Sequence, residues 1–383
     1  MTKTTFPILQ TAASIFLALT LSVSVNAQSG IPRPDHVVVL IMENHGYEDI
    51  IGNSSAPFIN SLAQENALMT SSYGLVHPSQ PNYLMLFSGS NQGVTNNNIP
   101  TDIPWSAPNL GASLMQSGFT FKGYSDGLPS VGFNGTSSGA YQRKHAPWTN
   151  WQGSSTNGIS SNRHRPFTDF PTNYNYLPTL SIVVPDQNHD MHDGTVAQGD
   201  SWVESNLGGY ISWAKTHNSL FILTFDEDDG DNLNHIVTVF AGEMVEPGSY
   251  ATSCNHYDVL RTLEDMYGLT YAGNSASANT ITEIWKTDNT TAVGELARNV
   301  SVRINPNPIA TTARVEVSGI SDAAGCTFII YDMLGNVVKD LSGEMILHHG
   351  VFAINREGIR NGIYFYRLSG PGQKEFTGKV VFE

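Results

Sequence analysis

The stretch His36–Gly46 reads H-V-V-V-L-I-M-E-N-H-G and indicates the class of fold. Its six consecutive apolar residues, Val37–Met42, predict a short strand buried on both faces, as in a parallel sheet between helices. Glu43, Asn44 and His45 follow at the carboxyl edge of that sheet, where ligands bind. Oxygen ligands at such an edge suit a hard or borderline metal ion. From these residues alone, a capping role for Glu43 is an equally good interpretation.

The composition is that of a globular protein with many loops. The chain has 383 residues, of which 40% are hydrophobic and 14% charged, and this length accommodates a large domain and a small one. Lys and Arg number 19 and Asp and Glu 34, so the net charge is −15. That charge argues against nucleic acid and anionic membrane surfaces as partners. A phosphate substrate would therefore need a local positive charge, most simply a metal ion.

Residues 1–27 resemble a secretory signal peptide. Lys3 gives the basic start, Phe6–Val25 is largely apolar, and Val25-Asn26-Ala27 is a small-residue cleavage sequence before Gln28. A membrane anchor is the alternative, but polar residues interrupt the run and no basic residue follows closely. We therefore expect export with removal of this segment. No other stretch approaches the length of a transmembrane helix.

Strands alternate with helices over the next 240 or so residues, which predicts an α/β domain with a mostly parallel sheet. Further strands are expected at Phe119–Tyr124, Thr179–Val184, Leu220–Phe225 and Ile236–Ala241. Helices are expected at Tyr47–Ile51, Ala56–Leu68, Ala112–Ser117, Trp202–His217 and Tyr257–Met266. Residues 130–172, rich in Gly, Ser and Asn, are expected to form a long ordered loop over the sheet.

The pattern changes after residue 286. Short alternating strands separated by turn residues predict a small all-β sandwich. We expect a signal peptide at 1–27, the α/β domain at 28–286, a linker at 287–301 and the β-sandwich at 302–383. The two cysteines, Cys254 and Cys326, then lie in different domains, and we expect them to be unbridged and buried.

A second predicted strand also ends in acidic residues. Leu220–Phe225 leads directly into Asp226-Glu227-Asp228-Asp229. Adjacent carboxylates disfavour each other's ionised form unless a cation is present. The spacing of a helix–loop–helix calcium site is absent. A buried strand that runs into Asp226 and Glu227 favours a metal site over a solvated acidic turn.

Ser79 is a candidate nucleophile. Pro78 and Pro81 flank it and restrict the backbone around it. A positioned hydroxyl becomes nucleophilic when something lowers its pKa, and coordination to a metal does this. The G-x-S-x-G elbow of α/β-hydrolases is not present here. A turn stiffened by proline is the alternative interpretation.

Histidines cluster after other predicted strands. The run Val184–Gly194 (V-P-D-Q-N-H-D-M-H-D-G) contains two histidines and three aspartates in a chain with 12 histidines. His235 follows the acidic turn, and His256 precedes the last helix of the α/β domain. Together with carboxylates, these positions favour function over structure. The basic cluster at residues 143–145 (R-K-H) is either a solvated patch or a binding site for phosphate oxygens.

Six of these motifs, in order, resemble the acid phosphatase and phospholipase C phosphoesterase family of the alkaline phosphatase superfamily. The resemblance covers about residues 34–275 and implies an alkaline-phosphatase-like α/β/α sandwich. The motifs are M-E-N-H at 42–45, H-P-S-x-P-N-Y at 77–83, R-K-H at 143–145, D-M-H-D at 190–193, F-D-E-D at 225–228 and H-Y-x-x-L-R-T at 256–262.

The resemblance implies a role for each matching residue. The divalent metal ion would be held by Glu43, Asn44, Ser79, Asp226 and Glu227. Ser79 would be the nucleophile, and His192 and His256 would stabilise the transferred phosphoryl group or protonate the leaving oxygen. The substrate phosphate would contact Asn44, His77, Lys144 and His145. One ion is expected, and His189 and His235 leave a second site open.

The C-terminal piece resembles a type IX secretion (Por) sorting domain. The carrying motifs are I-N-P-N-P at 304–308, I-Y-D-M-L-G-N-V-V at 330–338 and G-I-Y-F-Y-R-L at 362–368. The resemblance implies recognition by the type IX machinery, with release from the cell or attachment to its surface. A carbohydrate-binding or adhesive sandwich is the alternative.

Together these patterns predict a secreted, metal-dependent phosphomonoesterase that forms a phosphoserine intermediate on Ser79. A phospholipase C-like phosphodiesterase with the same core is the nearest alternative. The alternative of another class is a surface adhesin whose acidic turn binds calcium without catalysis.

Overall fold

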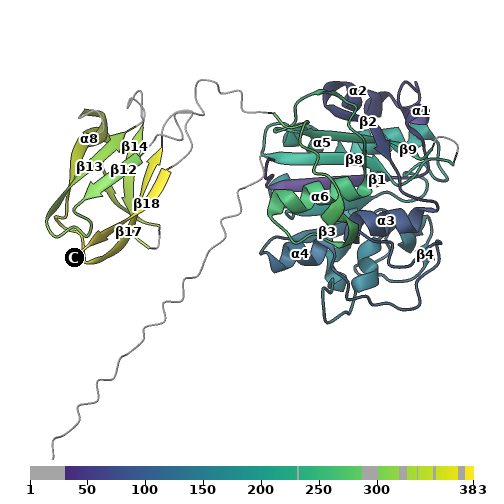
Figure 1. The fold of residues 1–383 in the computed structure, drawn as a ribbon, viewed down its shortest axis with the longest axis horizontal. Coiled ribbons are helices and arrows are strands. Elements are labelled where there is room, and N and C mark those ends of the chain that lie inside the picture. Colours follow the sequence, from purple (N-terminus) through teal and green to yellow (C-terminus); the bar gives the residue numbers. More distant parts are fainter. Residues whose placement is uncertain are drawn as a thin grey trace, which may run out of the picture. The chain divides into compact units, whose positions relative to one another are not determined.

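The computed structural model describes residues 31–230, 233–286, 301–318, 326–333, 335–347, 351–369 and 376–383. The predicted signal segment lies outside the described residues, as does the predicted linker apart from Ser301. The chain divides into two compact units, one up to Trp285 and one from Lys286 onward, and each is described by itself (Figure 1).

The larger unit is built on a nine-stranded sheet in which β1 (His36–Met42) is central. The main path has the order β10-β2-β9-β8-β1-β7-β3-β6, with β11 paired to β2. The strands are β2 (Ala67–Tyr73), β3 (Phe121–Ser125), β6 (His164–Pro166), β7 (Leu180–Val184), β8 (Ser219–Phe225), β9 (His235–Gly242), β10 (Gly248–Tyr250) and β11 (Cys254–Asn255). All pairs are parallel except those of β9 with β2 and β8. The predicted mostly parallel sheet is confirmed.

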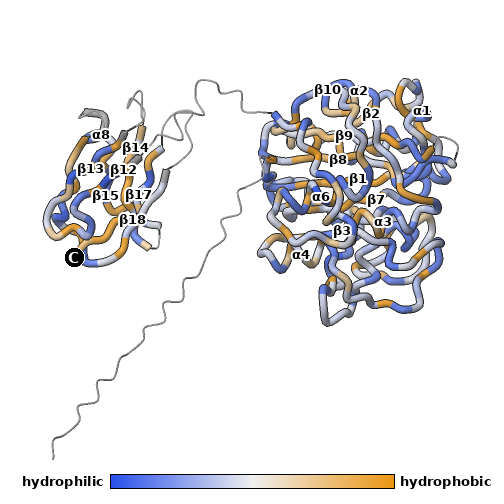
Figure 2. The backbone as a smooth tube through the Cα atoms, viewed as in Figure 1, coloured by the Kyte–Doolittle hydropathy of each residue, from blue (hydrophilic) through white to orange (hydrophobic). Residues whose placement is uncertain are grey.

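Helices cover both faces of this sheet (Figure 1). One face carries α2 (Pro57–Glu65) and α5 (Val196–Ala214), and the other carries α3 (Ser79–Ser88), α4 (Leu110–Gln116) and α6 (His256–Tyr267). Residues 37, 39 and 41 of β1 belong to one hydrophobic core, and residues 38, 40 and 42 to the other. This alternation explains the unbroken apolar run, because each buried aliphatic side chain contributes about 1.5–3 kcal/mol to folding. Figure 2 shows hydrophobic residues concentrated in the central strands.

Two predicted helices differ from the structure by several residues at one end, and one helix was not predicted, while the short helix α1 (Tyr47–Ile50) is confirmed. The helix predicted to reach Leu68 ends at Glu65, and β2 begins at Ala67. The helix α5 begins at Val196, earlier than predicted, because Thr195 and Gln198 cap its start reciprocally. The helix α3 was not predicted at all.

The loop predicted at 130–172 is more structured than expected. It contains the short strand pair β4 (Ser137–Ser138) and β5 (Tyr141–Gln142), and its strand β6 joins the edge of the large sheet. Five short 3-10 helices lie in or just after it: η1 (Arg143–His145), η2 (Pro147–Trp151), η3 (Ser161–Arg163), η4 (Phe167–Asp169) and η5 (Tyr174–Tyr176). A further one, η6 (Gly273–Ser277), follows α6.

The smaller unit contains two antiparallel sheets that share one hydrophobic core, which confirms the predicted β-sandwich. One sheet has the order β12-β13-β16 and the other β15-β14-β17-β18. The elements are β12 (Ser301–Asn305), β13 (Thr312–Ser318), β14 (Thr327–Tyr331), β15 (Val337–Asp340), α8 (Ser342–Leu347), β16 (Val351–Asn355), β17 (Gly362–Ser369) and β18 (Phe376–Phe382). The strand β16 and the helix α8 were not predicted. Cys254 and Cys326 are each buried within their own unit, as predicted.

Glu264 on α6 makes the stability of the larger unit dependent on pH. Burial raises its pKa from 4.5 to about 7, although hydrogen bonds from Ser275 Oγ (2.6 Å) and Ala272 N (2.8 Å) partly oppose the shift. Because the folded-state pKa is the higher one, the stabilising effect is complete below pH 4.5. It is lost as the pH rises through about 7.

We therefore expect Glu264→Gln to flatten the dependence of stability on pH between 4.5 and about 7. Glutamine keeps the size and the hydrogen bonds of the glutamate side chain without a titrating charge. Relative to wild type, the variant should gain on the order of 2–3 kcal/mol as the pH rises. Thermal melts of both proteins across the range measure this difference. Parallel profiles would show that Glu264 does not titrate there.

Candidate active site

The register of two parallel strands brings the predicted metal ligands together. Met42 at the end of β1 pairs with Phe225 at the end of β8, so Glu43 and Asp226 leave the sheet side by side. The Asp226 amide donates to the Met42 carbonyl (3.0 Å), and the Asn44 amide donates to Asp226 Oδ1 (3.1 Å). The same Asp226 oxygen accepts from the amide of the next residue (2.7 Å). The two predicted strand ends therefore form one cluster.

Ser79 lies inside this cluster. It is the first residue of α3, is 1% exposed, and follows a cis peptide bond between His77 and Pro78. Its Oγ lies 3.1 Å from Glu43 Oε2 and 3.0 Å from Glu227 Oε1. A hydroxyl has one hydrogen and cannot donate to both carboxylates at once. The hydroxyl hydrogen can therefore lie between Ser79 Oγ and only one of the two glutamate oxygens, and the other glutamate oxygen faces Oγ without that hydrogen.

The cluster fits a bound cation. Asn44 Oδ1 and Asp226 Oδ2 are buried, and neither accepts a hydrogen bond in the structure. Burial, and then the charges of Glu43 and Glu227, raise the pKa of Asp226 well above its usual range. Buried oxygen ligands that repel one another and lack donors are the expected surroundings of a hard metal ion.

His77 lies at the open side of the cluster. Its side chain is 45% exposed, and its Nδ1 lies 2.7 Å from Glu227 Oε2. Its Nε2 lies 3.2 Å from Asp228 Oδ1. His77 lies two residues before Ser79 in the chain. The carboxylates of Glu227 and Asp228 anchor its exposed imidazole.

The two histidines predicted to act on the phosphoryl group differ in their surroundings. His256 is buried at the start of α6, and its Nε2 donates to the Asp226 carbonyl (2.7 Å). Burial lowers its pKa to about 4 although this hydrogen bond opposes the shift, so the ring is neutral near pH 7. His192 is exposed, and its Nδ1 lies 2.8 Å from Asp193 Oδ1. Of the two, His192 is the one that solvent reaches.

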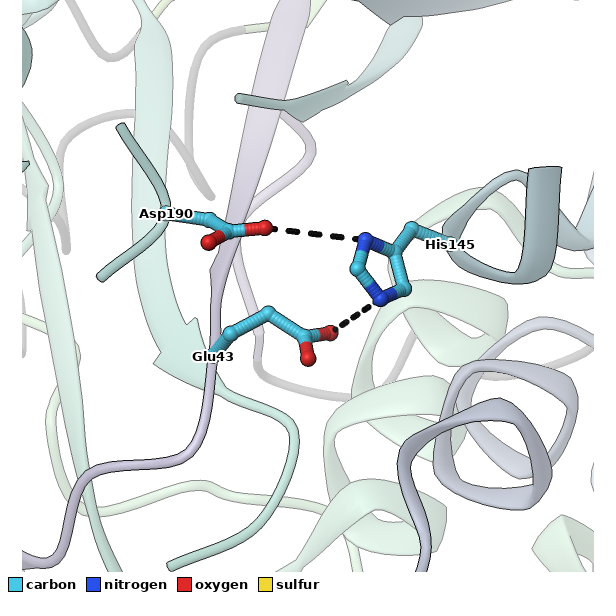
Figure 3. A group of neighbouring side chains, drawn as sticks. All are labelled: Glu43, His145 and Asp190. Atoms are coloured by element: carbon cyan, nitrogen blue, oxygen red, sulfur yellow. Dashed lines mark ion pairs between the residues drawn. The ribbon is translucent and has the colours of Figure 1, made fainter. Parts of the chain in front are cut away.

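The basic cluster does not form one patch. Arg143 is buried, and its Nε donates to Asn134 Oδ1 (2.7 Å). Lys144 is half-buried. Burial opposes ionisation of Glu43, but His145 and, to a smaller extent, the charge of Lys144 lower the pKa of that carboxyl. His145 is buried beside Glu43 (Figure 3). The three side chains therefore occupy three different environments.

Two neighbours of the cluster were not among the predicted site residues. Tyr83 is fully buried and stacks on His145, with ring centroids 5.1 Å apart. It lies four residues after Ser79 in α3, so a predicted helix would have placed both on one face. Asp190 is fully buried, and its backbone carbonyl accepts from the Glu43 amide (2.9 Å). Its sequence signals were its position in the His- and Asp-rich run after β7 and in the motif D-M-H-D at 190–193.

Known proteins resemble the two units separately. Residues 53–270 match the model of the Phosphoesterase family, and residues 303–383 match that of the secretion system C-terminal sorting domain. The phosphatidylinositol-3-phosphatase of Mycobacterium tuberculosis is 47% identical over 261 residues, which are 68% of this chain and 85% of that protein. An acid phosphatase of Aspergillus fumigatus is 27% identical over 63% of this chain, which spans 57% of that protein.

Among solved structures, an alkaline phosphatase superfamily protein from Vibrio parahaemolyticus is similar with a TM-score of 0.47 and 12% identity, covering 91% of this chain and 80% of that one. The family match and the sequence relatives define a hydrolase that acts on phosphate esters. The chain belongs to the Phosphoesterase family. Its second domain is of the type IX sorting kind, which indicates export to the cell surface or beyond. No helix among the described residues is long and apolar enough to cross a membrane.

Proposed function

We propose that the protein is a metal-dependent phosphomonoesterase that forms a phosphoserine intermediate on Ser79. The observation that carries this proposal is the position of the Ser79 hydroxyl between Glu43 Oε2 and Glu227 Oε1. A buried hydroxyl held between carboxylates at the carboxyl edge of a sheet has the surroundings of an activated nucleophile.

In the proposed mechanism, the Ser79 oxygen bonds to phosphorus while the bond from phosphorus to the leaving oxygen breaks. The hydroxyl hydrogen passes to a carboxylate oxygen of Glu43 or Glu227, each within hydrogen-bond distance. The exposed imidazole of His192 donates a proton to the leaving oxygen. Water then bonds to phosphorus while the bond to the Ser79 oxygen breaks. The serine oxygen takes back its proton from the carboxyl group and a proton of the water passes to His192, so that inorganic phosphate is released and the site is restored. His256 holds the Asp226 backbone in place through its Nε2 hydrogen.

The metal ion would be held by Glu43, Asn44, Ser79, Asp226 and Glu227. A divalent ion there would lower the pKa of the serine hydroxyl and offset charge on the phosphoryl oxygens. Asn44 and the half-buried Lys144 would contribute donors to the outer oxygens of the phosphate, with the exposed His77 at the entrance. The buried position of His145 favours a role other than contact with the substrate phosphate.

The substrate class is tested by comparing esters. The relative named phosphatidylinositol-3-phosphatase supports a phosphate monoester carried by an inositol lipid, and the acid phosphatase relatives support a small soluble monoester. We expect residues 28–300 to hydrolyse p-nitrophenyl phosphate and not its choline-phosphate diester. Turnover of the diester alone would favour the phosphodiesterase. Comparing vesicles that contain phosphatidylinositol 3-phosphate with the soluble ester then separates the two monoester classes.

The calcium-binding adhesin is the weaker alternative, because family membership supports catalysis.

We propose that a signal peptide at 1–27 directs the first stage of export, and that the C-terminal domain is removed or anchors the enzyme at the cell surface. Mass spectrometry of the exported protein tests both points. An N-terminus at Gln28 and the loss of residues beyond about 300 are the expected results.

A further inference from the structure

His145 lies buried between two carboxylates. Its Nε2 is 3.0 Å from Glu43 Oε1, and its Nδ1 is 3.6 Å from Asp190 Oδ2 (Figure 3). The ring is 2% exposed, and both carboxylates are fully buried. The stacking of Tyr83 on the ring, at an interplanar angle of 14°, restricts its rotation. The imidazole therefore lies within ion-pair distance of two carboxylates, one directly after β1 and the other in the loop after β7. We call this arrangement the bridge.

This geometry argues against two other roles for His145. A substrate phosphate would have to approach a buried ring whose two nitrogens already face carboxylates, and like charges would repel it. A metal ion held by all three residues is the other arrangement to consider, because their ligand atoms lie within 4.8 Å of one another. A single ion can be bound by only one ring nitrogen, whereas Glu43 and Asp190 face different nitrogens in Figure 3, so this arrangement fits the ring less well.

The bridge assigns different tasks to the two oxygens of Glu43. Oε1 faces His145, and Oε2 accepts from the Ser79 hydroxyl (3.1 Å). Asp190 anchors the far side, since its carbonyl accepts from the Glu43 amide (2.9 Å). Its Oδ1 also accepts from the His192 amide (2.8 Å). The same aspartate thus connects Glu43 to the loop that carries His192.

We propose that His145 and Asp190 are positioning residues that orient Glu43, so that its Oε2 faces Ser79 and the proposed cation. This inference rests on the proposed metal-dependent function and adds a role that the family resemblance did not imply for His145. Partners that orient a metal ligand typically account for about 10- to 100-fold in metal affinity. Loss of the bridge should therefore weaken metal binding before it affects contacts with phosphate.

The test measures metal affinity directly in the full chain after metal removal. Wild type, His145→Leu and His145→Gln are titrated with Mn²⁺, and free Mn²⁺ is followed by electron paramagnetic resonance. Leucine fills the space beside Tyr83 without a donor, so affinity should fall about 10- to 100-fold. Glutamine places an amide nitrogen near the position of Nε2 and should restore most of the affinity. Inhibition by inorganic phosphate at saturating Mn²⁺ should stay unchanged in both variants.

Two further variants control for general effects. His217→Leu removes an exposed histidine that stacks on Trp213 just before the start of β8, and it should leave Mn²⁺ affinity unchanged. Asp190→Ala should weaken Mn²⁺ binding in the same direction as His145→Leu, so the inference is tested even where one variant fails to fold.

The outcomes separate this inference from the proposed function. A wild-type protein that binds none of Mn²⁺, Zn²⁺ or Ca²⁺ would overturn the metal site and the inference with it. Wild-type affinity in His145→Leu and Asp190→Ala would overturn the inference alone. Weaker phosphate inhibition with unchanged Mn²⁺ affinity would make His145 a phosphate ligand and would also overturn it.

Discussion

Replacement of Ser79 by alanine should abolish phosphate-ester hydrolysis while leaving the fold intact. The side chain is small and buried, and the backbone of α3 does not depend on its hydroxyl. Without Oγ there is no atom to bond to phosphorus, so we expect kcat to fall by at least about 10⁴-fold. Steady-state hydrolysis of p-nitrophenyl phosphate measures the loss. Rapid acid quenching with mass spectrometry should find phosphate on Ser79 in the wild type and no phosphoserine in Ser79→Ala.

Ser88 provides a matched control in the same helix. It is also buried, and its Oγ donates to the Leu84 carbonyl (2.8 Å), away from the carboxylates. Ser88→Ala should therefore keep wild-type turnover and form the same intermediate. If Ser79→Ala retained substantial activity, the nucleophile would be a water molecule or another side chain.

Replacement of Asp226 by asparagine should have opposite effects on activity and on stability. The variant removes one charge from a buried group of carboxylates that repel one another, and burial together with Glu43 and Glu227 already raises the Asp226 pKa. In metal-free protein we expect a gain of about 1–2 kcal/mol. Each kcal/mol of added stability should raise Tm by about 2–4 °C. The same change removes a proposed metal ligand, so turnover should be lost even with excess Mn²⁺.

Asp200 provides the comparison for this prediction. It is buried like Asp226, but its two oxygens accept from the backbone amides of Phe58 (3.1 Å) and Ile59 (2.8 Å) at the start of α2. Asp200→Asn should therefore lower stability and leave turnover in the surviving folded protein unchanged. Calorimetry of metal-free wild type and both variants decides the point. A lower Tm in Asp226→Asn would show that its charge is satisfied without a metal ion.

The sequence predicted the strand ends of the site better than the other parts. The apolar runs that end at Met42 and Phe225 need two buried faces, and their parallel pairing places Glu43 and Asp226 together. The helix α3 was missed because all ten of its residues are buried, which leaves no polar face to reveal a helical period. Ser79 was therefore predicted as the nucleophile without its place at the start of a helix, and Tyr83, although part of the same motif, was not predicted as a site residue.

The environment of His145 could not be predicted from its neighbours. It stands in a basic run, which usually indicates a solvated surface, yet the ring is buried against Glu43 and Asp190. Those two residues lie 102 and 45 positions away in the sequence. Pairing over such distances follows from the order of the strands in the sheet, which local patterns do not contain.

The separation of the site residues along the chain has a consequence for folding kinetics. The contact between Asn44 and Asp226 closes a loop of 182 residues, and that between Ser79 and Glu227 closes one of 148. Closing long loops carries an entropic cost before any contact compensates for it, so such contacts form slowly. Catalytic competence should therefore be among the last properties to return on refolding, after most helical structure has recovered. An enzyme assembled in this way remains inactive until the chain is essentially native.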